Sequence, residues 1–197
     1  DEILANLLVL SKIRSRIKKI KKKSKFFNNS LSKNLISNFN FTLTNDQKKI
    51  TNEINTDLKS ENKMFRLLQG DVGSGKTIIS LIAASNVIES NYQVAFMAPT
   101  EILARQHYNL AKNIFRGTKV NIGFLVGNTK SLIKKKILNN LINGKIDLLI
   151  GTHALFQKHI FYNNLGLIII DEQHKFGVKQ RMKLADKGGD NCDVLVM

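Results

Sequence analysis

The sequence predicts an α/β domain in which helices flank a central, mostly parallel sheet, preceded by a basic helical segment. Short apolar runs alternate with helical patterns along residues 64–197, as they do in doubly wound sheets. The run 165–170 is continuously apolar, which is typical of a parallel strand buried on both faces. Turn residues or polar side chains follow several of these runs, at the strand ends where such sheets bind ligands.

The expected elements follow one another with short connections. Thr44 is the expected N-cap of a first helix that ends near residue 58, and Thr100 is the N-cap of a later one, directly after Pro99. The pattern predicts further helices at 78–88, 100–115 and 131–142, and strands at 64–68, 93–98, 120–126, 147–150, 165–170 and 193–197.

The start of the chain differs from the rest. Apolar residues at helical spacing from Ile3 to Ile20, with basic residues between them, predict a long amphipathic helix. Residues 24–38 are rich in Ser and Asn and indicate a linker. We therefore expect an appendage at 1–37 and the α/β domain at 38–197. Because the chain begins with Asp1 rather than Met, we expect a fragment of a longer protein.

The formal net charge of +16 indicates an anionic partner, with nucleic acid favoured over a membrane surface. Half of the excess lies in residues 1–40, which hold ten Lys or Arg against two acids. Heavy use of Lys, Asn and Ile also fits an A·T-rich coding sequence, so charge supports nucleic-acid binding only in part. No run approaches the roughly 18 apolar residues of a membrane span, and the single cysteine, Cys192, excludes an internal disulfide. We expect a cytoplasmic protein without membrane contact.

The segment G-D-V-G-S-G-K-T matches the phosphate-binding loop pattern G-x-x-x-x-G-K-[ST] and lies between a predicted strand and a predicted helix. Its glycines allow backbone N–H groups to converge on phosphate oxygens. Lys76 is expected to reach the β and γ phosphates, and the Thr77 hydroxyl is expected to hold Mg²⁺. The predicted nucleotide-binding residues of this loop are Gly70, Asp71, Val72, Gly73, Ser74, Gly75, Lys76 and Thr77.

An acidic pair follows the apolar run 165–170 and supplies candidate metal-binding and catalytic carboxylates, which the phosphate loop lacks. Asp171 is expected to hold Mg²⁺, and Glu172 to position and deprotonate the attacking water. His174, two residues further on, is close enough to sense the nucleotide. His107 and His159 belong to no such motif, and we interpret them as structural or surface residues.

Upstream of the loop, an aromatic residue and a glutamine, Phe41 and Gln47, form a pattern with which many nucleic-acid motors hold adenine. In that arrangement the ring stacks on the base and the amide hydrogen-bonds to its edge. The pattern is weak alone, since Phe41 as a core residue and Gln47 as a solvated helix residue explain it somewhat better when the rest of the chain is left aside.

Taken in order, these motifs resemble the first RecA-like motor domain of superfamily 2 helicases of the DExH type. Within that superfamily, residues 39–197 are most similar to the branch-migrating DNA helicases. The segments that carry the resemblance are F-T-L-T-N-D-Q, R-L-L-Q-G-D-V-G-S-G-K-T, M-A-P-T-E-I-L-A-R-Q-H, G-T-H-A-L-F-Q and D-E-Q-H-K-F-G-V-K-Q-R.

The resemblance implies a RecA-like P-loop NTPase fold that uses ATP and Mg²⁺. It implies that Phe41 and Gln47 contact adenine and that His174 couples the nucleotide state to DNA. It also implies two DNA-contacting segments, which comprise Pro99, Thr100 and Glu101, and Thr152 and His153. A DNA-binding wedge domain and a second RecA-like domain that supplies arginines to the γ phosphate are expected in such proteins and absent from this chain, so we expect weak activity from it alone.

Two alternatives remain open at this point. The coupling factors of transcription and repair, which translocate on duplex DNA, are similar over the same region. A non-catalytic fragment that binds nucleotide and DNA without turnover would also carry these motifs.

Overall fold

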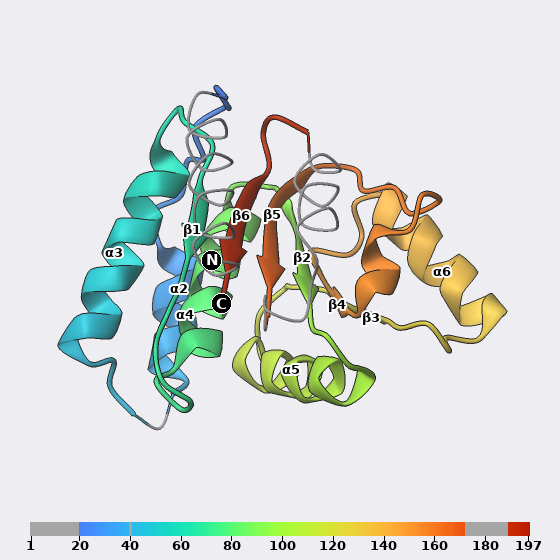
Figure 1. The fold of residues 1–197 in the computed structure, drawn as a ribbon, viewed down its shortest axis with the longest axis horizontal. Helices are drawn as coiled ribbons and strands as arrows, with labels where there is room; N and C mark the ends of the chain where they lie inside the picture. Colours follow the sequence, from blue (N-terminus) through green and yellow to red (C-terminus); the bar gives the residue numbers. More distant parts are fainter. Residues whose placement is uncertain (1–19, 40, 172–188) are drawn as a thin grey trace, which may run out of the picture.

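The computed structural model describes residues 20–39, 41–171 and 189–197, in which helices surround one twisted sheet (Figure 1). Six strands form the sheet in this part of the chain, in the order β1-β6-β5-β2-β4-β3, and every pairing is parallel. This architecture confirms the predicted α/β fold. The strands are β1 (Phe65–Leu67), β2 (Gln93–Met97), β3 (Ile122–Leu125), β4 (Leu148–Gly151), β5 (Leu165–Ile170) and β6 (Asp193–Val196).

The helices also follow the predicted pattern, with one exception described below. Thr44 and Thr100 are the N-caps of α3 and α5, and each hydroxyl accepts a hydrogen bond from a backbone N–H three residues on. Among the described residues, no helix has the length and apolarity needed to span a membrane. The helices are α2 (Ser30–Ser37), α3 (Asn45–Lys59), α4 (Lys76–Glu89), α5 (Glu101–Ile114), α6 (Ser131–Ile142) and the 3₁₀ turn η1 (His153–Phe156).

Side chains of the strands alternate between two apolar layers. On β2, Val94 and Phe96 belong to one buried cluster, and Ala95 and Met97 belong to the other. Helices α2, α3, α4 and α5 contribute to the first cluster, whereas α6 and η1 contribute to the second. Both faces of the central strands are therefore covered, which explains why these strands are continuously apolar in sequence.

The prediction of a linker at 24–38 is wrong, because this segment packs on the domain. Leu35 on α2 is fully buried in the cluster that α3 and α4 also line. Glu89, the last residue of α4, accepts hydrogen bonds from the backbone N–H groups of Ser30 and Leu31 at 3.3 Å each. These contacts satisfy donors at the start of α2 and fix it to α4. The amphipathic helix predicted before residue 20 lies outside the described residues, and the boundaries 1–37 and 38–197 stay a prediction.

Candidate functional site

The loop between β1 and α4 has the backbone that its glycines predict. Gly73 and Gly75 adopt positive φ angles of 82° and 87°, a conformation that other residues rarely adopt. Helix α4 begins at Lys76, directly after Gly75, so its first N–H groups lie at the end of the loop. The segment therefore offers the convergent backbone donors of a phosphate site.

Lys76 folds back over this loop. Its Nζ donates to the carbonyl oxygens of Gly70 and Asp71 at 2.7 and 2.8 Å. Both bonds are solvent-exposed and made to neutral carbonyls, and charge-assisted bonds to an anion are stronger than bonds to neutral groups. A phosphate at the loop can therefore compete for this ammonium group.

Gln47 connects helix α3 to the same loop. Its Oε1 accepts from the N–H of Thr44 at 3.0 Å, completing a capping box, and its Nε2 donates to the carbonyl of Ser74 at 3.0 Å. A Cβ at Gly75 would lie 2.5 Å from this Nε2. The side chain of Gln47 thus fills space that a glycine keeps open, and the structure places its amide against the backbone of the loop.

Phe41 lies next to this arrangement in sequence and is half-exposed, at 50%. Its ring stacks on that of Phe39, with centroids 5.0 Å apart and planes only 4° from parallel. One face of the Phe41 ring is thus covered by Phe39. Contact of Phe41 or Gln47 with adenine stays a prediction.

Asp171 follows β5 directly and has two partners. Its N–H donates to the carbonyl of Met97 at 2.9 Å, and its Oδ2 lies 2.7 Å from Nε2 of His107. The two side chains are largely buried, with 16% and 11% exposed. The imidazole of His107 also stacks on the ring of Phe96, with centroids 4.7 Å apart. The predicted metal ligand is therefore held by β2 and α5.

His107 is the residue that sequence reasoning missed. The buried residues of α5 are Ala104, His107, Ala111 and Ile114, so a histidine interrupts an otherwise apolar stripe. A buried polar side chain needs a partner, and that requirement is the signal that could have singled it out. Glu172 and His174 lie outside the described residues, and within those residues no group of three or more His, Cys, Asp and Glu side chains is arranged to hold a metal ion.

The two segments predicted to contact DNA lie at neighbouring strand ends. Strands β2 and β4 pair directly, and the N–H of Ala98 donates to the carbonyl of Gly151 at 2.9 Å. Pro99, Thr100 and Glu101 follow β2, and Thr152 and His153 follow β4. Thr152 is buried, whereas Thr100 and His153 are exposed. The structure brings these segments to one edge of the sheet, and their contact with DNA stays a prediction.

A model of the DEAD/DEAH box helicase family matches residues 44–192. The match covers more than half of the chain, and the chain belongs to this family. Its members share the RecA-like arrangement of helices around a parallel sheet that the structure has.

Within the family the chain is similar to RecG, as the motifs predict. It is 45% identical over 197 residues to the ATP-dependent DNA helicase RecG of Thermotoga maritima, covering 100% of this chain and 25% of that protein. RecG of Streptococcus pneumoniae is 51% identical over 157 residues, 80% of this chain and 23% of that protein. A solved structure of RecG bound to a three-way DNA junction superposes with a TM-score of 0.84 at 43% identity, covering 94% of this chain and 25% of that one. The chain thus spans about a quarter of the length of these relatives.

Proposed function

We propose that this chain is the first motor lobe of an ATP-dependent DNA helicase that remodels branched DNA in repair and recombination. One observation carries the proposal: the phosphate loop and Asp171 follow strands of one parallel sheet, in a chain similar along its described length to RecG bound to a three-way DNA junction. The alternative of a duplex translocase of the coupling-factor type is not favoured by these relatives. We further propose 38–197 as the motor lobe and a cytoplasmic location.

The residues at this edge fit a nucleoside triphosphate with Mg²⁺. The loop combines two glycines at positive φ with a helix start and with the ammonium of Lys76, and together these suit a polyphosphate. The hydroxyl of Thr77 and the carboxylate of Asp171 are oxygen donors, which Mg²⁺ prefers. When bound, Mg²⁺ would neutralise charge on the phosphate oxygens.

The protein groups would then act in distinct roles. Lys76 would exchange its two carbonyl partners for phosphate oxygens. Gln47 and Phe41 would hold the adenine base. Glu172 would orient the attacking water and accept its proton, and His174 would report the nucleotide state to the DNA contacts. In helicases of this kind a second RecA-like lobe contributes arginines, and the lack of such a residue slows phosphoryl transfer by ~10³-fold or more.

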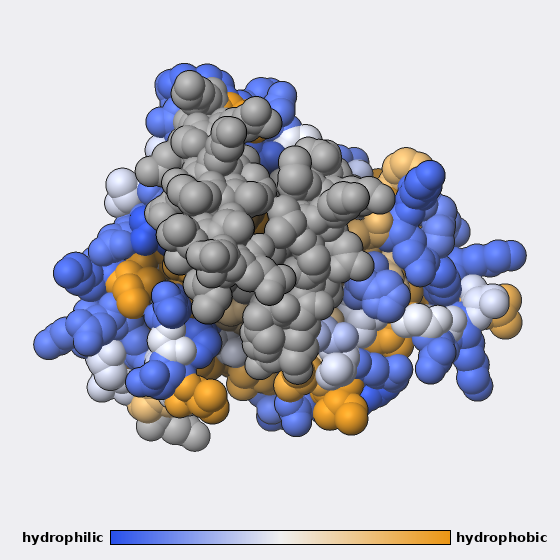
Figure 2. Space-filling model, viewed as in Figure 1, coloured by the Kyte–Doolittle hydropathy of each residue, from blue (hydrophilic) through white to orange (hydrophobic). Residues whose placement is uncertain are grey.

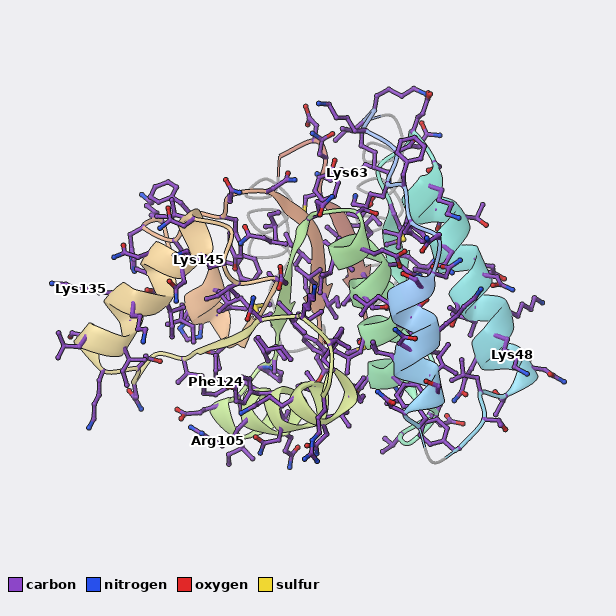
Figure 3. The ribbon with its side chains drawn as sticks, turned by 180° about the vertical axis from the view of Figure 1, so that it is seen from behind. Lys48, Lys63, Arg105, Phe124, Lys135 and Lys145 are labelled. Atoms are coloured by element: carbon purple, nitrogen blue, oxygen red, sulfur yellow. The ribbon has the colours of Figure 1, made fainter. Side chains whose placement is uncertain are left out.

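The charge of the described residues supports a DNA partner. Residues 102–170 hold ten Lys or Arg against one acid, Asp147, a net charge of +9, whereas residues 20–101 hold eleven against seven, a net charge of +4. The excess thus lies in the half of the domain built from α5, α6, β3 and β4. Arg105, Lys135 and Lys145 belong to this half, while Lys48 projects from α3 at the opposite end (Figure 3).

This basic half includes Thr152 and His153 after β4, and it begins directly after the segment 99–101, so both segments predicted to contact DNA lie in or next to it. Figure 2 shows hydrophilic side chains projecting from the end of the molecule where α6 lies. Lysines around a phosphate backbone give affinity without reading sequence, which suits an enzyme that acts on a DNA structure rather than on a site. We propose a wedge domain and the second motor lobe as further partners.

The proposal is tested by nucleotide binding to the 197-residue chain, followed with a fluorescent ATP analogue and Mg²⁺. Wild-type chain should bind, Lys76→Ala should lose binding, and Lys135→Ala on α6, at the end of the domain opposite α3, should bind like wild type (Figure 3). Equal binding by Lys76→Ala would contradict a phosphate site at this loop.

The preference for branched DNA is tested with a protein that carries both motor lobes. Branched DNA should stimulate ATP hydrolysis more than linear duplex of equal length. Equal stimulation by both would favour a duplex translocase, and DNA binding without any nucleotide binding would favour a non-catalytic module.

A further inference from the structure

The metal-binding carboxylate proposed above is held by one structural unit. Asp171 donates its N–H to Met97 on β2 and shares a 2.7 Å hydrogen bond with His107 on α5. An ionised carboxylate only accepts hydrogen bonds, so Nε2 of His107 is the donor. The imidazole is itself fixed by stacking on Phe96 of β2 at 4.7 Å. Both the backbone and the side chain of Asp171 therefore depend on the β2–α5 unit.

This unit also carries a segment expected to contact DNA. Residues 99–101 lie where the chain passes from β2 into α5, whose first residue is Glu101, and Thr100 caps the helix by accepting from the N–H of Leu103 at 3.3 Å. His107 lies seven residues after Thr100, about two helical turns, so the two residues share one face of the helix at a rise of roughly 10 Å. A short, continuous helix therefore joins the DNA-facing turn to the residue that holds Asp171.

We propose that His107 is a positioning residue, which orients the Asp171 carboxylate for Mg²⁺ and links the turn 99–101 to the nucleotide site. The inference rests on the proposed function. A hydrogen bond to Oδ2 limits rotation of the carboxylate and leaves the lone pairs of Oδ1 for a cation. Partners that orient metal ligands in this way typically change metal affinity by about 10- to 100-fold when they are removed.

The contact between His107 and Asp171 also connects the segment expected to bind DNA with the nucleotide site. DNA that displaces the turn after β2 would shift α5, and with it the donor to Asp171. Coupling of this kind is reciprocal, since DNA must alter nucleotide affinity by the same factor by which nucleotide alters DNA affinity. Factors of about 5 to 150 are usual for coupled sites.

The first experiment compares His107→Gln with His107→Leu in the 197-residue chain. The glutamine amide can place an N–H near the position of Nε2, whereas leucine removes the donor and keeps an apolar side chain. The readout is the Mg²⁺ concentration that gives half-maximal binding of a fluorescent ATP analogue. His107→Leu should raise it by about 10-fold or more, and His107→Gln should stay within about threefold of wild type.

Asn109→Leu, on the exposed side of the same helix, is the matched control and should leave the Mg²⁺ requirement unchanged. Urea unfolding of each variant checks that the fold is intact. An unchanged Mg²⁺ requirement in a folded His107→Leu would overturn the positioning role while leaving the proposed function standing. Retained binding by Lys76→Ala would instead count against the proposed function itself.

The link to DNA is tested by measuring nucleotide affinity with and without a saturating branched DNA, and DNA affinity with and without nucleotide. In wild type, the factor by which DNA changes nucleotide affinity should equal the factor by which nucleotide changes DNA affinity, and both ratios should differ from one. His107→Leu should bring both ratios close to one while leaving DNA affinity without nucleotide unchanged. Ratios of one in wild type, or equal coupling in His107→Leu, would overturn the link.

Discussion

Nζ of Lys25 lies 2.6 Å from Oδ2 of Asp193, and both side chains are completely buried. Lys22 reaches the same oxygen at 2.7 Å, and the N–H of Met64 donates to Oδ1 at 2.6 Å. One carboxylate therefore joins the segment before α2, the entrance to β1 and the first residue of β6. These contacts fix residues 22–25 to the sheet, although that segment looks like a solvated basic run in sequence.

Replacing Asp193 by Asn should destabilise the domain strongly. The substitution leaves two buried ammonium groups without an anion, and breaking a buried ion pair from one side typically costs about 3–5 kcal/mol. The measurement is the free energy of unfolding from urea titration. Glu61→Gln is the control, because Glu61 pairs with Lys21 at 3.7 Å while 75% and 71% of these side chains are exposed, and exposed pairs contribute at most about 1 kcal/mol. Equal losses in both variants would mean that the buried cluster contributes no more than a surface pair.

Gly75→Ala should impair nucleotide binding more than it impairs folding. The new Cβ would lie 2.5 Å from Nε2 of Gln47 and would displace the amide from the carbonyl of Ser74. It would also impose a positive φ of 87° on alanine, at a cost of about 1–2 kcal/mol. Binding of a fluorescent ATP analogue and urea unfolding are measured together.

The control for this variant is Gly117→Ala, where φ is 79° and nothing lies within 4 Å of the added Cβ. It should show a similar loss of stability with normal nucleotide binding. If both alanine variants bind nucleotide equally well, the contact between Gln47 and the loop has no role in the site.

The strands and the site's outline could be predicted because their signals are local. An apolar run such as 165–170 is recognisable from its own residues alone, and the phosphate loop has its glycines and lysine within eight consecutive residues. The rule that ligands bind at the carboxyl ends of parallel strands then places Gly70, Pro99, Thr152 and Asp171 at one edge without further information.

The remaining features depend on partners far away in the chain. Asp171 meets His107 across 64 residues, and Lys25 meets Asp193 across 168. Helix α2 has a short, Ser- and Asn-rich sequence, and its start is satisfied by Glu89 from another helix. Each of these residues looks like an ordinary polar or surface residue until the fold supplies its partner, so neither spacing nor composition reveals its role.

Charge removal on α6 should weaken DNA binding and reduce its salt dependence. Lys130, Lys135 and Lys136 are exposed at the start of this helix, in the basic half of the domain. Each phosphate contact adds about 0.9 to the slope of log affinity against log salt. The variant in which all three are Gln should lower that slope by up to about 3. The matched variant changes Lys33, Lys48 and Lys49, exposed on α2 and α3, and should bind like wild type. A similar loss in both variants would show that net charge matters and not this surface.

Cys192 should make the stability of the domain fall at alkaline pH. The side chain is fully buried just before β6, and burial raises the pKa of its thiol from 9.0 to about 12. Because the pKa is higher in the folded state, the unfolded chain releases this proton first, and stability is lost as the pH rises above 9.

The size of this effect can be isolated with Cys192→Ala. Between pH 8 and pH 10 the free energy of unfolding should fall by about 1.4 kcal/mol more in wild type than in the variant. Lys22, whose pKa burial lowers, acts in the opposite direction, since its release of a proton in the folded state raises stability as the pH approaches 10.5. The variant keeps Lys22, so the difference between the two pH profiles reports the thiol alone. Parallel profiles would mean that the thiol ionises as readily in the folded domain as in the unfolded chain.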